Sequence, residues 1–177
     1  MKNLLNIFDS KKYLDLALKN RKKYVRSKPF PHIYFDNFLP RKLAITLSKE
    51  YPKIKNVDKN WRVHKNENVD RYFLEDSSLY KKNLKIFSML VNSRKFLLFL
   101  ETLTGVSSIL PDPFFIGGGA MTTGKGGFLN IHADFNYHHK LQSWRKINAL
   151  FYLTPNWKKN WGGNLEFWSK NKKKKIR

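Results

Sequence analysis

Residues 126–136 read GGFLNIHADFN, two glycines followed by a strand-like segment with a histidine and an aspartate two positions apart. Successive side chains of a β-strand point to opposite faces, so we expect His132 and Asp134 to project side by side from one face. An imidazole and a carboxylate placed in this way supply two of the three ligands of a 2-His-1-carboxylate iron site. The same two residues can also form an ordinary hydrogen-bonded pair, and the motif alone leaves both interpretations open.

The sequence predicts helices in the first part of the chain and strands in the last. Helices are expected over residues 3–26, over residues 41–50 and in two segments between residues 78 and 104, with Gly105 as a C-terminal cap. Strands are expected at 32–35, 128–135, 147–153 and 164–168, with Gly162 and Gly163 allowing positive φ in the last turn. The polar, aperiodic stretch 53–70 is predicted to be irregular. This order favours the α+β class.

Length and composition indicate one folded domain. The chain has 177 residues, of which 41% are hydrophobic, which is enough for a core and too apolar for a disordered chain. It has no cysteine, which excludes disulfides, thiolate metal sites and cysteine nucleophiles. A bound metal would therefore need histidine, aspartate or glutamate ligands.

The charge and the hydropathy pattern restrict the partners. The net charge of +22 comes from 35 lysines and arginines against 13 acidic residues. The lysines are spread along the chain, whereas nucleic-acid sites concentrate charge on one face, so nucleic acid is not expected as the primary partner. No apolar run reaches the roughly 20 residues of a membrane helix, and no cleavable leader is recognisable. We therefore expect no membrane association and a cytoplasmic location.

The glycine-rich stretch also invites comparison with a phosphate-binding loop. Gly119, Gly124 and Lys125 satisfy the pattern G-x-x-x-x-G-K. However, Gly126 replaces the serine or threonine that would hold magnesium, and a strand-like segment follows instead of a helix. These two defects argue against a nucleotide site.

Further motifs surround residues 126–136 in a recognisable order. They are LTG at 103–105, LPDP at 110–113, GGG at 117–119, FYLT at 151–154 and WGGNLEFW at 161–168, together with Arg145, Asn148, Trp157 and a segment ending DNFLP at 36–40. With these motifs, residues 29–168 resemble the iron(II)/2-oxoglutarate dioxygenases of the prolyl 4-hydroxylase-like group.

The resemblance implies a fold and a division of the chain. The expected architecture is a double-stranded β-helix, or jelly roll, incomplete at its C-terminus, with N-terminal helices packed on its major sheet. A basic N-terminal helix would occupy residues 1–28 and the dioxygenase domain residues 29–177. Within that domain, the helical support would span 41–105, the β-core 114–168 and a lysine-rich tail 169–177.

The resemblance also implies cofactors and site residues. Fe(II) and 2-oxoglutarate would be the cofactors and ascorbate the reductant. Decarboxylation of 2-oxoglutarate with O2 would drive hydroxylation of a prolyl or other side chain, in a peptide or a small molecule. His132 and Asp134 would hold the iron, and Tyr152 would reach the distal carboxylate of 2-oxoglutarate, although Tyr152 also suits a core position. Asn148 lies on the same strand face as Tyr152 by period two and is assigned with it to cofactor binding.

The sequence departs from the family's pattern after Trp168. A second iron-binding histidine and the following 2-oxoglutarate-binding arginine or lysine are expected there, but no histidine follows His139. Truncation of the gene product, a fragment, completion by a second polypeptide, or use of His138 or His139 as a third ligand would each explain this, and truncation is favoured. Missing strands would also leave open sheet edges that permit self-association. The alternative function is a degenerate, non-catalytic jelly roll that binds an anionic partner.

Overall fold

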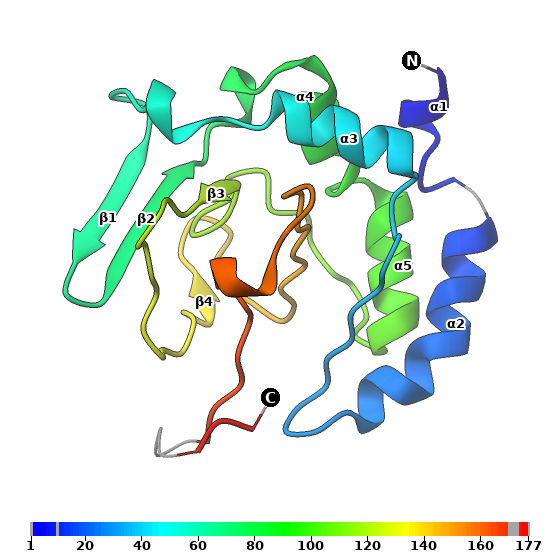
Figure 1. The fold of residues 1–177 in the computed structure, drawn as a ribbon. Coiled ribbons are helices and arrows are strands. Elements are labelled where there is room, and N and C mark those ends of the chain that lie inside the picture. The colour runs from blue at the N-terminus through cyan, green and yellow to red at the C-terminus, as the bar shows by residue number, and fades with distance from the viewer. Residues whose placement is uncertain (1, 10, 170–173, 177) are drawn as a thin grey trace. The chain divides into compact units, whose positions relative to one another are not determined.

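The computed structural model describes residues 2–9, 11–169 and 174–176 and contains both helices and small antiparallel sheets (Figure 1). The chain divides into two compact units. The helical unit comprises Met1–Glu50 and Ser78–Pro113, and the sheet unit comprises Tyr51–Ser77 and Phe114–Arg177. A search of the described residues finds no helix with the length and apolarity needed to cross a membrane.

Among its described residues, the helical unit contains five α-helices. They are α1 (Lys2–Leu5), α2 (Lys11–Arg26), α3 (Arg41–Glu50), α4 (Lys82–Leu90) and α5 (Arg94–Thr104), and a 3-10 turn, η2 (Ser77–Leu79), leads into α4. The predicted helix at 41–50 and the two predicted between 78 and 104 are confirmed. The prediction of one continuous helix over 3–26 is wrong in its middle, because α1 ends at Leu5 and a turn follows in which Asp9 N–H donates to Asn6 O at 3.1 Å. Residue 10, which the predicted helix included, lies outside the described residues.

A cluster of aromatic rings forms the centre of the helical unit. The turn after α1 buries Phe8, whose ring lies 4.7 Å from that of Phe96 on α5. Phe38 lies 5.3 Å from Phe99 between ring centroids, and Tyr13 on α2 donates its hydroxyl hydrogen to Phe38 O at 3.0 Å. Figure 1 shows α2 and α5 running side by side. Ring contacts of this kind add to the burial of apolar area.

Residues 32–35 contribute to the same cluster but do not form the predicted strand. The segment has no regular secondary structure, and Phe35 places its ring 5.8 Å from Phe38 and 6.2 Å from Phe99. The prediction was wrong because a short run such as Ile33 to Phe35 can pack a side chain into a core without any strand pairing.

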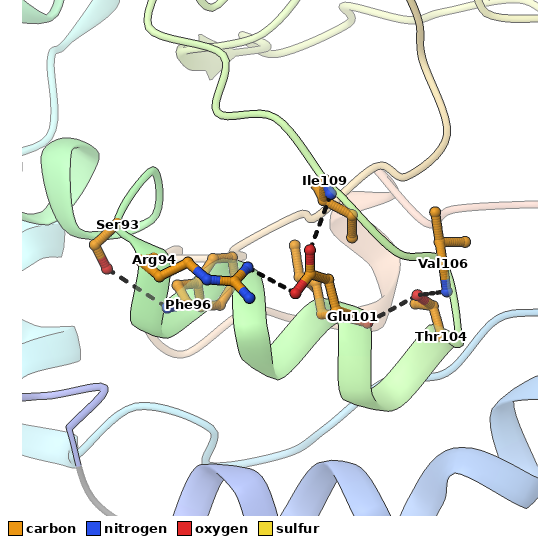
Figure 2. Close-up of polar contacts among 8 residues, drawn as sticks. Ser93, Arg94, Phe96, Glu101, Thr104, Val106 and Ile109 are labelled. Atoms are coloured by element: carbon orange, nitrogen blue, oxygen red, sulfur yellow. Dashed lines mark hydrogen bonds and ion pairs between the residues drawn. The ribbon is translucent and has the colours of Figure 1, made fainter.

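Polar contacts define both ends of α5 (Figure 2). Ser93 accepts a hydrogen bond from Phe96 N–H at the N-cap, and Gly105 takes the left-handed conformation, φ 77°, at the C-terminal end, as predicted. Glu101 joins the helix to the chain that follows it, because its carboxylate pairs with Arg94 at 2.6 Å and accepts from Ile109 N–H at 3.0 Å. These bonds fix the exit from the helix.

The sheet unit contains a three-stranded antiparallel sheet in the order β1–β2–β3 (Figure 1). Its strands are β1 (Arg62–Asn66), β2 (Val69–Leu74) and β3 (Ala120–Thr122), and a 3-10 turn, η1 (Ile54–Asn56), precedes β1. The prediction that 53–70 is irregular is therefore wrong for the β1–β2 hairpin. Asn66 Oδ1 accepts from Asn68 N–H at 2.8 Å in the hairpin turn, which is local asparagine chemistry typical of turns. The strands were missed because charged and amide residues outnumber apolar ones there.

The predicted strands after residue 127 are only partly paired in the described chain. Residues 128–135 make one isolated bridge, Val69 to Leu129, and residues 164–168 make one at Trp168 with Lys175. The prediction of a strand at 147–153 is wrong, because these residues form neither a strand nor a bridge. A small hairpin joins β4 (Tyr137–His138) to β5 (Ser143–Trp144), and the 3-10 turn η3 (Lys159–Trp161) precedes Gly162. Gly162 and Gly163 have φ of 72° and 73°, as predicted. The jelly roll itself stays a prediction, and residues 170–173 and 177 of the predicted lysine-rich tail lie outside the described residues.

Candidate metal centre

The segment that carries His132 runs antiparallel beside the first half of β2. Asp70 N–H donates to Phe128 O and Asn130 N–H donates to Asn68 O, both at 2.9 Å. Gly127 makes this approach possible, because a Cβ added there would lie 2.8 Å from Asp70 O. Any larger residue would push the segment away from the strand. The glycine pair of the sequence motif thus positions the segment, and the chain reaches His132 two residues beyond the last of these bonds.

A hydrogen bond to the backbone oxygen of Asn130 holds His132 in one tautomer. Its Nδ1 lies 2.8 Å from Asn130 O, and since a carbonyl oxygen only accepts, Nδ1 carries the hydrogen. In the neutral ring, Nε2 then presents its lone pair. A backbone carbonyl on the other nitrogen is the usual support of a metal-binding imidazole.

His132 and Asp134 lie side by side, as period two predicts. Nε2 of His132 is 3.1 Å from Oδ1 of Asp134, and the two side chains are 46% and 47% exposed. The other oxygen of Asp134, Oδ2, accepts a hydrogen bond from Nδ2 of Asn148. One carboxylate oxygen is therefore directed at the imidazole while the other is fixed by an amide.

This arrangement fits a metal ion. Nε2 and Oδ1 are both acceptors in the neutral tautomer, so a proton or a cation must lie between them for the contact to be favourable. Imidazole and carboxylate ligands bind metals such as zinc at about 2.1 Å, and two such ligands at a right angle are about 3 Å apart. The observed separation of 3.1 Å agrees with that spacing.

A third ligand is not brought to the pair. Across residues 2–9, 11–169 and 174–176, no group of three or more histidine, aspartate or glutamate side chains is arranged to hold a metal. His138 is buried on β4, where its Nδ1 accepts from Leu141 N–H at 3.1 Å and its ring lies 6.1 Å from Phe114. His139 is exposed and packs edge-on against Tyr137 at 5.3 Å. Neither histidine completes the site in this structure.

Tyr152 lies near a residue that the sequence did not single out, Arg71 on β2. Desolvation raises the pKa of the Tyr152 hydroxyl, and the Arg71 guanidinium acts in the opposite direction. Burial lowers the pKa of Arg71, while Tyr152 and Asp134 act to raise it. The strand that carries Arg71 was not predicted, because the residues before it have the composition of a loop. Arg71 and Tyr152 are 81 positions apart, so no local sequence pattern relates them.

The structure thus combines a histidine–aspartate pair on an extended segment, a supporting amide and a nearby tyrosine and arginine. Residues 118–177 match the family model of the 2OG-Fe(II) oxygenase superfamily. The matched residues include His132, Asp134, Asn148 and Tyr152, whereas Arg71 lies outside them. No curated protein and no solved structure matches the chain significantly.

The match to the 2OG-Fe(II) oxygenase superfamily supports a dioxygenase-like function and indicates that the protein is an oxidoreductase by class. It implies Fe(II) and 2-oxoglutarate as cofactors, and O2 and a substrate as reactants. The geometry of His132 and Asp134 agrees with the iron that the superfamily uses.

Proposed function

We propose that this chain is a prolyl 4-hydroxylase-like dioxygenase in which His132 and Asp134 hold Fe(II). The observation that carries the proposal is the 3.1 Å separation of His132 Nε2 and Asp134 Oδ1, with Nδ1 engaged by Asn130 O. When bound, iron and 2-oxoglutarate supply oxidation: 2-oxoglutarate and O2 become succinate and carbon dioxide, and one oxygen atom enters a C–H bond of a prolyl or other side chain. Ascorbate is the proposed reductant.

Two further residues of the chain support this assignment. Asn148 positions Asp134 by donating to Oδ2, so that Oδ1 stays turned toward the imidazole. Tyr152 is 68% exposed, and its raised pKa keeps the hydroxyl protonated at neutral pH. A protonated hydroxyl can donate to a carboxylate, the role proposed for Tyr152 toward 2-oxoglutarate.

One observation favours the alternative of a degenerate, non-catalytic protein that binds an anionic partner. The described residues bring two metal ligands together and no third one. Two protein ligands hold a metal more weakly than three, because each ligand adds to the binding free energy. Binding of iron and turnover of 2-oxoglutarate are therefore separate questions for this chain.

Substrate-independent turnover of 2-oxoglutarate tests the proposal. The purified chain is incubated with Fe(II), ascorbate and 2-oxoglutarate, and succinate is measured beside His132→Ala and His139→Ala. We expect succinate from the parent and from His139→Ala, and none from His132→Ala, because only His132 lies beside Asp134. Absence of succinate from the parent would overturn the catalytic proposal and favour the non-catalytic alternative.

A further inference from the structure

The β4–β5 hairpin carries a cluster of aromatic rings that solvent reaches. Tyr137 and Trp144 are directly opposite each other in the antiparallel pair, and their ring centroids are 5.3 Å apart in an edge-to-face arrangement. The ring of His139 also lies 5.3 Å from that of Tyr137. Trp144 is 62% exposed, and His139 is exposed as well. An edge-to-face contact covers at most one face of a ring, so aromatic surface stays open on this hairpin.

Strand alternation gives the hairpin an inner and an outer face. His138 is buried and its ring lies 6.1 Å from that of Phe114, whereas its neighbour His139 is exposed. Along residues 141–148, half-buried and exposed positions alternate, and Trp144 and Lys146 both belong to the exposed set. The outer face therefore combines aromatic rings with a lysine two positions from the tryptophan. Exposed apolar surface that is clustered, rather than scattered singly, is typical of a binding surface.

The charge around these rings is positive without compensation. Lys140, Arg145 and Lys146 lie in or directly beside the hairpin, and residues 135–165 contain no aspartate or glutamate. None of these three cations has an ion-pair partner in the part of the chain that the structure describes. The Arg145 guanidinium instead lies 4.4 Å from the ring centroid of Phe135. Lysines are spread along the chain as a whole, but on this hairpin the cations lie beside exposed rings and have no acidic neighbours, which favours an anionic, aromatic ligand.

We propose that the outer face of the β4–β5 hairpin binds single-stranded nucleic acid, with a base stacked on Trp144 and phosphates close to Lys146 and Arg145. Each nucleotide offers a flat aromatic base and a negative charge, and exposed rings beside unpaired cations match both. A duplex keeps its bases stacked on one another, so it would leave the indole without a partner. Stacking accepts every base, and we therefore expect little sequence preference. This binding needs neither Fe(II) nor 2-oxoglutarate and is separate from the metal centre.

Fluorescence anisotropy with labelled oligonucleotides tests the inference on the full chain. One probe is an oligothymidylate of about 12 nucleotides, within the range of single-strand sites. The other is an abasic strand of the same length, which keeps the phosphates and lacks the bases. The variants are Trp144→Ala and Trp144→Phe. Trp161→Ala is the matched control, because Trp161 is 55% exposed and also has a cation, Lys158, 5.9 Å from its ring centroid. Thermal unfolding confirms that each variant is folded at the temperature used.

We expect the parent to bind the oligothymidylate more tightly than the abasic strand. Trp144→Ala should lose this preference, with the affinity for the oligothymidylate falling roughly fivefold to a hundredfold. Its affinity for the abasic strand should stay unchanged, which a merely structural role of Trp144 would not predict. Trp144→Phe should keep most of the preference, and Trp161→Ala should keep all of it.

The salt dependence of binding tests the part assigned to the cations. Lys146→Gln should weaken binding of both probes and reduce the slope of log affinity against log salt by roughly 0.7, the value for one phosphate contact on a single strand. Lys158→Gln is the control and should keep the slope of the parent. Equal affinity of the parent for the two probes, or a preference that persists in Trp144→Ala, would overturn the inference, because the attraction would then come from the net charge of +22 alone.

Discussion

Asn148 donates a hydrogen bond to Oδ2 of Asp134, the carboxylate oxygen that does not face His132. The two residues are 14 positions apart, and the β4–β5 hairpin lies between them. In the proposed metal centre the amide acts through Asp134, because it limits rotation of the carboxylate. Outer partners of this kind commonly contribute tenfold to a hundredfold to metal affinity.

Replacing Asn148 by alanine is therefore expected to weaken Mn(II) binding by roughly tenfold or more while the fold is kept. The matched control is Asn136→Ala, an exposed asparagine whose backbone oxygen accepts from Arg145 N–H and is unaffected by the change. Titration with Mn(II), monitored by the electron spin resonance of the free ion, measures both affinities. Equal affinity in Asn148→Ala and the parent would show that the amide does not support the ligand.

Gly127 is expected to tolerate no larger residue, because a Cβ at this position would clash with neighbouring atoms. An added Cβ would lie 2.5 Å from Thr123 Cγ2 and 2.8 Å from Asp70 O. We expect Gly127→Ala to destabilise the protein by roughly 1–3 kcal/mol, as overpacking does. Chemical denaturation with urea measures the change in the free energy of unfolding.

The double variant Gly127→Ala with Thr123→Ala separates the two clashes. Removing the threonine side chain relieves the first contact, but the backbone oxygen of Asp70 remains, so most of the loss should persist. Full recovery of stability in the double variant would mean that β2 does not constrain the segment before His132.

Glu101 is expected to make stability depend on pH. The hydrogen bond from Arg94, followed by the one from Ile109 N–H, lowers the pKa of Glu101 below its ordinary value of 4.5. A group whose pKa is lower in the folded state stabilises the fold above its unfolded-state pKa, and that contribution is lost as the pH falls through the folded-state value. Glu101→Gln should therefore lower the Tm at pH 7, and its difference from the parent should shrink below about pH 4.5.

Thermal unfolding followed by circular dichroism, in buffers from pH 7 to pH 3, measures this difference. Asp15→Asn is the control, because Asp15 is exposed on α2 and its replacement should leave the Tm nearly constant relative to the parent. A Tm difference for Glu101→Gln that did not change with pH would contradict the assigned ion pair.

The sequence predicted those elements whose signals are local. The helix at 41–50 ends before Pro52, and α5 ends at a glycine in the left-handed conformation, so helical periodicity and end signals agreed there. The β1–β2 hairpin was missed because Arg62, Lys65 and Asp70 gave it the composition of a loop. Its strands are stabilised by pairing with each other and with β3, which is information that no local window contains.

The candidate site likewise contains residues whose arrangement local sequence predicts and residues whose arrangement depends on the tertiary structure. His132 and Asp134 are two residues apart, so strand alternation alone predicted their juxtaposition. Arg71 lies on β2 and Tyr152 lies 81 positions later, so the electrostatic interaction between them depends on tertiary structure. The role of Asn148 beside Asp134 likewise depends on how the chain returns after β5, which the sequence does not specify.

The Mn(II) affinity of His132→Ala and Asp134→Ala, with His139→Ala as control, tests most directly whether the His132–Asp134 pair binds metal. We expect the parent and His139→Ala to bind Mn(II) alike and both ligand variants to lose binding, because a single remaining ligand cannot hold the ion. Equal Mn(II) affinity in the parent, His132→Ala and Asp134→Ala would contradict it.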